Sequence, residues 1–138
     1  MRPIFVDSAY YIALMNPRDS LHGRAVELFN YVQTADDVTL TTTDAVLVEV
    51  LTRASKFGPH TRRAAANLAL RVADDPRVAV LPQSGALFDA GLDLYRRRID
   101  KAYSMTDCIS MVVCRSQRIR EVLTSDHDFE QEGFAILM

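Results

Sequence analysis

Short apolar runs alternate along this chain with longer stretches in which apolar residues recur at helical spacing. The short runs predict five strands, over residues 4–6, 38–42, 78–81, 122–124 and 134–137. The longer stretches predict helices over residues 8–15, 20–35, 44–57, 60–73, 84–95 and 105–113. Short strands that are apolar on both faces and separated by helices are typical of parallel sheets buried on both sides. The pattern therefore predicts a three-layer α/β/α domain with a mainly parallel five-stranded sheet.

Chain length and composition indicate a folded, soluble protein. The 138 residues, of which 49% are hydrophobic, fit one domain spanning residues 1–138, because compact domains cluster around roughly 100–150 residues. No apolar run approaches the roughly 20 residues of a membrane-spanning helix, and Asp7 interrupts the N-terminus too early for a secretory signal peptide. The only two cysteines, Cys108 and Cys114, lie in an apolar helical stretch, as expected in a reducing compartment. We therefore expect a cytoplasmic location and no association with a membrane.

The charge of the chain argues against a protein that binds nucleic acid by bulk positive potential, because the formal net charge is −2. Among the 16 basic residues, however, only Lys56 and Lys101 are lysines, and the guanidinium groups of the rest offer a planar fork suited to phosphate. Runs of arginine most simply form solvated helix faces. Arg53 and Arg97 are candidates for contact with a nucleic-acid backbone.

Four acidic residues occupy positions that can meet at one edge of the predicted sheet. Asp7 directly follows the first strand and Asp126 follows the fourth, and the carboxyl ends of parallel strands share one edge. Glu49 and Asp107 lie in otherwise apolar helical stretches, near the start of each. An aspartate after a strand often caps a helix, and Asp107 in a first helical turn suits the helix dipole. Glu49 is harder to explain in this way, because a carboxylate in an apolar helix is costly unless it is paired or coordinated.

Carboxylates that share one cleft repel each other, so that some of them must take up protons unless a cation lies between them. Oxygen ligands without a cluster of histidine or cysteine favour Mg²⁺ or Mn²⁺ over Zn²⁺. Such an ion can polarise a phosphate, lower the pKa of a bound water and stabilise the leaving oxygen. The acidic residues therefore predict metal-dependent hydrolysis of a phosphodiester.

The segments that carry these acids resemble those of the PIN domain, the metal-dependent nuclease fold of VapC-type toxins in prokaryotic toxin–antitoxin pairs. The resemblance spans essentially the whole chain and rests on the order and spacing of short segments. These are Val6–Ser8, Thr42 with the apolar stretch around Glu49, Ser104–Ile109 and Leu123–Phe129. The resemblance implies a PIN-like fold and a ribonuclease that acts as the toxin of a type II toxin–antitoxin pair.

The resemblance also implies which residues bind the metal and which support them. The acids that would hold Mg²⁺ or Mn²⁺ are Asp7, Glu49, Asp107 and Asp126. The hydroxyl groups that would support these acids are those of Ser8, Thr106 and Thr124. Asp128 departs from the family pattern and is an alternative or additional fourth ligand. His127 lies in the same loop and needs no function.

The family further implies RNA as the substrate, a homodimer, and an antitoxin that blocks the site. The sequence brings no nucleophilic side chain or histidine base near the acids, so we expect attack by water, which leaves a 5′-phosphate and a 3′-hydroxyl end. Asp7 would be the central ligand, and Glu49 would hold a second ion or orient the water. Apolar side chains of the first helix would line an antitoxin groove, a dimer contact or the core; these are Tyr10, Tyr11, Leu14 and Met15.

Other classes of protein stay open on the sequence alone. A PIN nuclease outside toxin–antitoxin pairs, or a PIN-like interaction module without catalysis, would share the fold, although the presence of all four acids argues against a decayed site. A phosphotransfer domain also carries an aspartate after its first strand. A phosphatase of the haloacid dehalogenase type would have a second aspartate where this chain has Ala9. A receiver domain needs a lysine after a late strand, and this chain has only Lys56 and Lys101.

Overall fold

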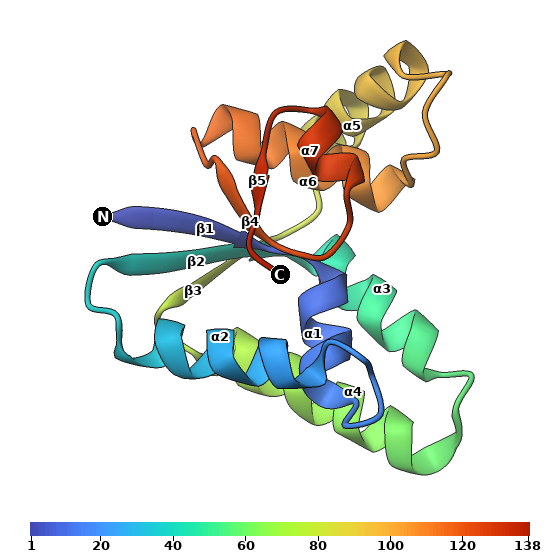
Figure 1. Cartoon of the computed structure of the whole chain (residues 1–138). Coiled ribbons are helices and arrows are strands. Elements are labelled where there is room, and N and C mark those ends of the chain that lie inside the picture. Colours follow the sequence, from blue (N-terminus) through green and yellow to red (C-terminus); the bar gives the residue numbers. More distant parts are fainter.

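The computed structural model describes residues 1–138 and arranges them as five strands and seven helices around one sheet (Figure 1). The strands are β1 (Arg2–Val6), β2 (Val38–Thr43), β3 (Val78–Leu81), β4 (Glu121–Leu123) and β5 (Ala135–Ile136). The helices are α1 (Ser8–Met15), α2 (His22–Thr34), α3 (Asp44–Ala54), α4 (Gly58–Asp74), α5 (Gly85–Arg97), α6 (Met105–Ser116) and α7 (Asp128–Gln131). None of the helices combines the length and the apolar character that a membrane crossing requires.

The sheet has the strand order β3-β2-β1-β4-β5, and every neighbouring pair is parallel. From β1 the chain builds outward through β2 to β3, and then returns so that β4 lies on the other side of β1. The strand order therefore reverses between β1 and β4. In parallel sheets this reversal opens a crevice beyond the carboxyl ends of the two strands, where ligands bind. Asp7 and Asp126 follow these two strands.

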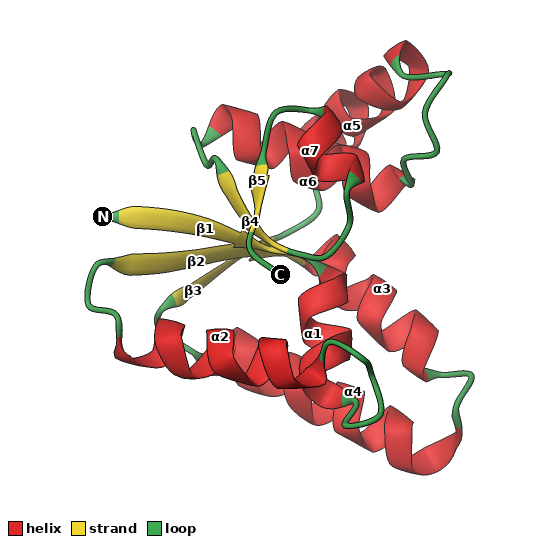
Figure 2. Cartoon of the chain, in the orientation of Figure 1, coloured by secondary structure: helices red, strands yellow, loops and turns green.

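Helices cover both faces of the sheet (Figure 2). Helices α2 and α4 lie along one face, together with α1 and α3, which begin directly after β1 and β2, while α5, α6 and α7 lie on the other face. The central strand β1 forms the middle of the core, and its residues Ile4, Phe5 and Val6 are completely buried. The predicted three-layer α/β/α fold is confirmed, with a sheet that is parallel throughout.

Hydroxyl side chains cap the N-termini of two helices that lead away from the crevice. Thr43 caps α3 by accepting a hydrogen bond of 3.1 Å from the Val46 N–H. Ser104 caps α6 in the same way, with a hydrogen bond of 3.0 Å from the Asp107 N–H.

Two features of the helices differ from what the apolar pattern predicts. Helix α7 is missing from the prediction, because four residues are too few to produce a helical repeat of apolar positions. The pattern also predicts that Leu51 on α3 points inward, which is wrong because 38% of this residue is exposed. Val46, Leu47 and Val50 fill the buried arc of α3, and the apolar arc of the helix is wider than the arc that the core covers.

Candidate metal centre

Asp7 lies directly after β1 and is the most deeply buried acid of the crevice, with 3% of its surface exposed. Its Oδ2 atom accepts a hydrogen bond of 2.8 Å from the Thr124 hydroxyl, while Oδ1 is buried without any partner. Burial raises the pKa of Asp7 to about 7 in spite of the Thr124 hydrogen bond, and the charges of Asp107 and Glu49 add to the rise. Asp7 occupies the N-cap position of α1 but its side chain makes no capping hydrogen bond, so capping does not explain its burial.

Asp107 lies in the first turn of α6 and is held there by a reciprocal capping box. The Asp107 N–H donates to Ser104 Oγ, and the Ser104 N–H donates to Asp107 Oδ2, both at 3.0 Å. Burial raises the pKa of Asp107 to about 6 in spite of these hydrogen bonds, and the charges of Asp126 and Glu49 add to the rise. Asp107 therefore supports the start of its helix and at the same time faces other acids.

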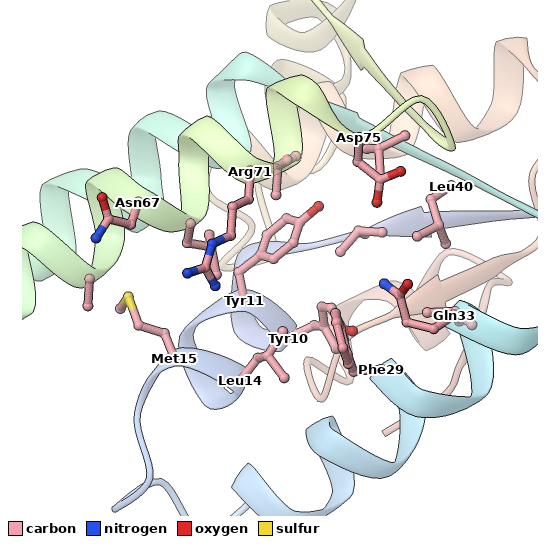
Figure 3. Close-up of a pocket in the computed structure, with 16 residues that line it drawn as sticks. Tyr10, Tyr11, Leu14, Met15, Phe29, Gln33, Leu40, Asn67, Arg71 and Asp75 are labelled. Atoms are coloured by element: carbon pink, nitrogen blue, oxygen red, sulfur yellow. The ribbon is translucent and has the colours of Figure 1, made fainter.

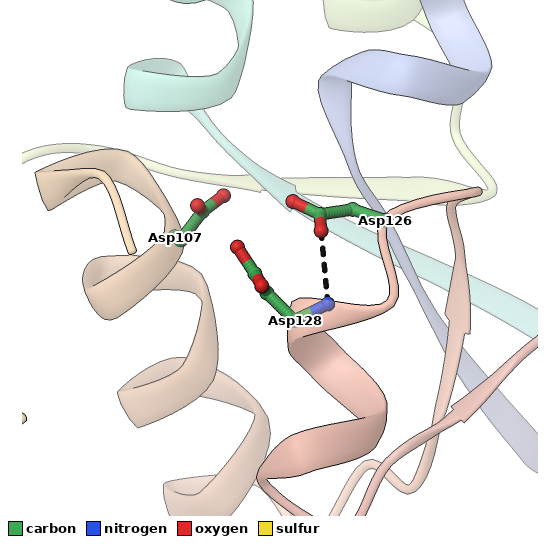
Figure 4. Close-up of side chains that lie close together, drawn as sticks. All are labelled: Asp107, Asp126 and Asp128. Atoms are coloured by element: carbon green, nitrogen blue, oxygen red, sulfur yellow. Dashed lines mark hydrogen bonds between the residues drawn. The ribbon is translucent and has the colours of Figure 1, made fainter. Parts of the chain in front are cut away.

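Asp126 and Asp128 bring further carboxylates against Asp107 (Figure 4). One oxygen from each of these three residues lies within 4.8 Å of the others. The Asp128 N–H donates to Asp126 Oδ1 at 2.9 Å, and the Asp126 N–H donates to Thr124 Oγ1 at 3.1 Å, which fixes the loop between β4 and α7. Burial and the charge of Asp126 raise the pKa of Asp128, while Lys101 counteracts this rise.

Glu49 approaches the crevice from α3 and is half-buried. Its Oε2 atom accepts a hydrogen bond of 2.7 Å from the Ser8 hydroxyl at the start of α1. Glu49 lies outside the three-carboxylate cluster, as does Asp7, but its charge raises the pKa values of both Asp7 and Asp107. The acids of the crevice therefore form one electrostatic unit, whose densest part is the cluster in Figure 4.

The chemistry of this donor set fits a hard divalent cation. The clustered groups are all carboxylates, and no histidine or cysteine joins them. The buried Asp7 Oδ1 atom is an acceptor without a donor, an arrangement that is costly unless something supplies positive charge. His127 lies in the same loop as the cluster, but its ring contacts Glu130. The crevice therefore offers the ligands that Mg²⁺ and Mn²⁺ prefer.

A family model described as the PIN domain matches residues 4–134, a span that includes all the acids of the crevice. The chain belongs to the PIN domain family. Over 131 residues it is 30% identical to the 23S rRNA-specific endonuclease VapC20 of Mycobacterium tuberculosis, in the strains CDC 1551 and H37Rv, and the alignment covers 95% of both proteins.

Solved structures of similar proteins have the same fold as this PIN domain. The crystal structure of VapC20, described as a sarcin–ricin loop cleaving toxin, matches with a TM-score of 0.83 at 27% identity over 96% of each chain. VapBC2 from Rickettsia felis matches with a TM-score of 0.66 at 12% identity over 97% of this chain and 96% of the other. FitAcB from Neisseria gonorrhoeae matches with a TM-score of 0.63 at 16% identity over 98% of this chain and 96% of the other. The predicted family, a VapC-type PIN domain, and the predicted class of protein, an endoribonuclease toxin, are confirmed.

The hydroxyl residues expected to support the acids differ in the hydrogen bonds that they make with them. Ser8 and Thr124, two of the three hydroxyl residues expected to support the site, donate hydrogen bonds to acids of the crevice. Thr106, the third, is half-buried and makes no hydrogen bond with them. Ser104 instead holds Asp107, a role that sequence analysis did not assign. Ser104 and Asp107 are three positions apart, which is the spacing of a capping box, and this spacing is the feature of the sequence that indicates the role of Ser104.

The arginines expected to contact a nucleic-acid backbone are both exposed. Arg97 pairs with Asp93 at 3.0 Å on the exposed side of α5, and Arg53 is exposed in the last turn of α3. Lys101 is the cation whose charge reaches the cluster, through Asp128. Lys101 also pairs with Asp100 at 3.8 Å.

Proposed function

We propose that residues 1–138 act as a single PIN domain that hydrolyses RNA with a divalent cation, Mg²⁺ or Mn²⁺, held by the acids of the crevice. The ligands in this proposal are Asp7, Glu49, Asp107, Asp126 and Asp128. Two observations carry it together: the buried Asp7 Oδ1 atom has no hydrogen-bond partner, and one oxygen from each of Asp107, Asp126 and Asp128 lies within 4.8 Å of the others. None of the ion pairs in the structure involves any of these acids, so no basic side chain of the protein pairs with them directly.

Neighbouring side chains orient the acids for this task. The Thr124 hydroxyl donates to Asp7 Oδ2 and accepts from the Asp126 N–H, so that one side chain holds two ligands. The Ser8 hydroxyl holds Glu49, which orients the attacking water or contributes to a second ion. A cation bound among these acids supplies Lewis acidity that polarises the scissile phosphate, lowers the pKa of the water and stabilises the leaving oxygen.

The proposed substrate is 23S ribosomal RNA, and within it the sarcin–ricin loop. Two findings support this choice: the relative VapC20 is named a 23S rRNA-specific endonuclease and described as cleaving that loop, and its alignment covers 95% of both chains. The net charge of −2 favours recognition of a folded loop through local contacts over binding by bulk charge. Attack by water breaks the bond between phosphorus and the 3′ oxygen, which leaves a 5′-phosphate and a 3′-hydroxyl end.

The proposed protein partner is an antitoxin that occupies an apolar groove between α1, α2 and α4 (Figure 3). The groove has a volume of about 600 Å³, and 12 of the 16 residues that line it are hydrophobic. Tyr10 and Tyr11 line it from α1 although they are largely buried, and Leu14 and Met15 extend it as half-buried side chains. Phe29 lines it from α2 and is 39% exposed. Grooves of this kind accept an amphipathic segment of a partner chain.

We further propose a homodimer that forms through the outer face of α5. Phe88, Leu92 and Tyr95 follow helical spacing on α5 and are 47%, 39% and 50% exposed. Exposed apolar stripes of this kind mark protein interfaces. Leu92→Glu is expected to convert the dimer to a monomer in sedimentation equilibrium, and a Leu92→Glu dimer of unchanged stability would exclude this face.

The experiment that tests the proposed activity is cleavage of a sarcin–ricin loop hairpin by the purified protein in Mg²⁺ or Mn²⁺. The wild type is expected to cut the loop, whereas EDTA or Asp107→Asn abolishes the cut. Asp89→Asn removes an exposed carboxylate from α5 and is the matched control, which cleaves like the wild type. Cleavage that survives EDTA would contradict the proposed requirement for a divalent cation. Cleavage of other RNAs but not of this loop would contradict only the substrate.

A further inference from the structure

Outside the acidic crevice, the largest ionic network of the molecule surrounds Glu132, directly after α7. The Glu132 side chain is 5% exposed and accepts hydrogen bonds from Arg98 Nε at 3.0 Å, from Arg115 Nη2 at 2.7 Å and from the Tyr103 hydroxyl at 3.1 Å. Burial by itself would raise the pKa of Glu132, but these donors outweigh it and lower the pKa to about 2. Glu132 is therefore a buried and fully ionised carboxylate at neutral pH.

The residues of this network come from the segments that carry the clustered acids. Arg98 directly follows α5, Tyr103 immediately precedes the capping box of Asp107, and Arg115 lies in the last turn of α6. Glu132 directly follows α7, the helix that begins with Asp128, one of the clustered acids. The network thus connects α7 to the end of α5 and to both ends of α6.

Helix α7 requires support because its four residues make a single turn, which is marginal by itself. The turn ends in a Schellman motif, in which Gly133 has a φ of +91° and the Phe134 N–H donates to Phe129 O at 3.1 Å. The rings of Phe129 and Phe134 pack edge to face, with centroids 6.2 Å apart. These contacts shape the turn, and Glu132 adds directional bonds that tie it to α5 and α6.

We propose that Glu132 is a positioning residue of the metal centre, which ties α7 to α6 and so keeps Asp126 and Asp128 against Asp107. The inference rests on the proposed function, since it assumes that this cluster binds a divalent cation. One oxygen from each of the three acids lies within 4.8 Å of the others, and their repulsion acts to move the loop away from α6. Charge-assisted hydrogen bonds from two guanidinium groups to Glu132 resist that movement.

The chain contains a matched control in a second arginine–glutamate pair. Arg2 donates to Glu121 through Nε at 2.7 Å and through Nη2 at 2.6 Å, between the first residues of β1 and β4. The Arg2 hydrogen bond lowers the pKa of Glu121, as the network does for Glu132. The pair lies at the amino ends of its strands, and the acidic crevice lies beyond their carboxyl ends. Loss of this pair therefore reduces stability without touching the acids.

The test is isothermal titration of Mn²⁺ into Glu132→Gln and Glu121→Gln, below the unfolding temperature of each protein. Glutamine keeps the size of the side chain and removes its charge. Glu132→Gln is expected to weaken Mn²⁺ binding by roughly tenfold, the lower end of the loss seen for groups that orient metal ligands, whereas Glu121→Gln stays within about twofold of the wild type. Equal affinities in the two variants would overturn the proposal, whatever their unfolding temperatures.

The wild type and a milder variant separate the remaining outcomes. A wild-type protein that binds no Mn²⁺ would refute the proposed function, whereas wild-type binding that Glu132→Gln leaves unchanged would refute only the positioning role. If Glu132→Gln does not fold, Tyr103→Phe removes a single hydrogen bond from the same carboxylate and takes its place. Weaker Mn²⁺ binding in Tyr103→Phe than in Glu121→Gln supports the proposal, and equal binding contradicts it.

Discussion

Thr124 and Asp7 lie 117 positions apart in the chain and are joined by a hydrogen bond of 2.8 Å where the strand order reverses. The bond forms because β1 and β4 are parallel neighbours with Val6 opposite Leu123, so that the residues after these two strands meet. Thr124 is completely buried and Asp7 is 3% exposed. The Thr124 oxygen also accepts from the Asp126 N–H, which makes this side chain the junction between the acids that follow the two strands.

Thr124→Val keeps the shape of the side chain and removes both of these hydrogen bonds. The rate of RNA cleavage is expected to fall by roughly tenfold to a hundredfold, the range typical for loss of a group that orients metal ligands. Thr41→Val is the matched control, because Thr41 is buried on the neighbouring strand β2 and its hydroxyl contacts none of the acids. Cleavage at the wild-type rate by Thr124→Val, or an equal loss in Thr41→Val, would show that Asp7 needs no such support.

The raised pKa values of two acids predict that the metal-free protein loses stability as the pH rises. Burial raises the pKa of Asp7 from 3.8 to about 7 and that of Asp107 to about 6, so the folded state holds these protons more tightly than the unfolded state. The resulting stabilisation is fully present below the unfolded value of 3.8 and is lost as the pH rises through the folded values. Thermal unfolding in EDTA is therefore expected to show a Tm that falls between about pH 5 and about pH 8.

Two controls identify the source of this pH dependence. Mn²⁺ supplies the missing positive charge, so its addition raises the Tm more at the alkaline end of this interval than at the acid end. Asp7→Asn removes most of the dependence in EDTA, whereas Asp89→Asn preserves it. Glu132 does not contribute here, because its pKa of about 2 means that its stabilisation is lost only in stronger acid. A Tm in EDTA that is flat or rises over the interval would contradict the burial of ionisable Asp7.

The close contact between α5 and α6 supports the helix that carries Asp107. A Cβ atom at Gly91 would lie 2.7 Å from Ile109 Cγ1 and 3.2 Å from Met105 Cε. Gly91→Ala is therefore expected to lower the free energy of unfolding by roughly 1–3 kcal/mol through overpacking. Gly23→Ala, in α2, adds a Cβ atom that meets nothing within 4 Å, and is expected to raise that free energy by up to about 1 kcal/mol. Urea unfolding measures the change in the free energy of unfolding for each variant. A Gly91→Ala variant that is more stable than the wild type would be inconsistent with the close contact between α5 and α6.

The proposed antitoxin groove is tested by placing a charge in it. Phe29→Glu changes a groove residue on α2, and is expected to prevent copurification with a coexpressed antitoxin while RNA cleavage stays unchanged. Leu70→Glu is the control, because Leu70 is 65% exposed on α4 and does not line the groove. Retained binding by Phe29→Glu, or loss of binding by Leu70→Glu alone, would mean that the antitoxin binds elsewhere.

The sequence predicts the strands and the acids of the crevice because both follow from short-range patterns. Asp7 directly follows the apolar run of β1, and a parallel sheet brings the residues after its strands to one edge. Glu49 stands out because it interrupts an apolar helix, although the structure gives it a polar partner in Ser8 and leaves it half-buried. Knowledge of the sheet type was therefore sufficient to bring together Asp7 and Asp126, which are distant in the chain.

Other contacts between distant segments do not follow from the geometry of a parallel sheet, and the sequence alone does not predict them. Glu132 meets Arg98 and Tyr103 from 34 and 29 positions away, and nothing in its local pattern distinguishes it from a surface glutamate. The approach of Asp128 to the cluster depends on α7, whose single turn leaves no periodic signal. The influence of Lys101 on the pKa of Asp128 depends on the path of the loop before α6. These are properties of packing in three dimensions.

The most direct measurement is a calorimetric titration of the wild-type protein with Mn²⁺, compared with Asp107→Asn and Asp89→Asn. If the crevice holds a catalytic cation, the wild type and Asp89→Asn bind Mn²⁺ saturably, Asp107→Asn loses this binding, and RNA cleavage rises over the same range of Mn²⁺ concentration. A wild-type protein that cleaves RNA without binding Mn²⁺, or an Asp107→Asn variant that binds it as tightly as the wild type, would contradict the account.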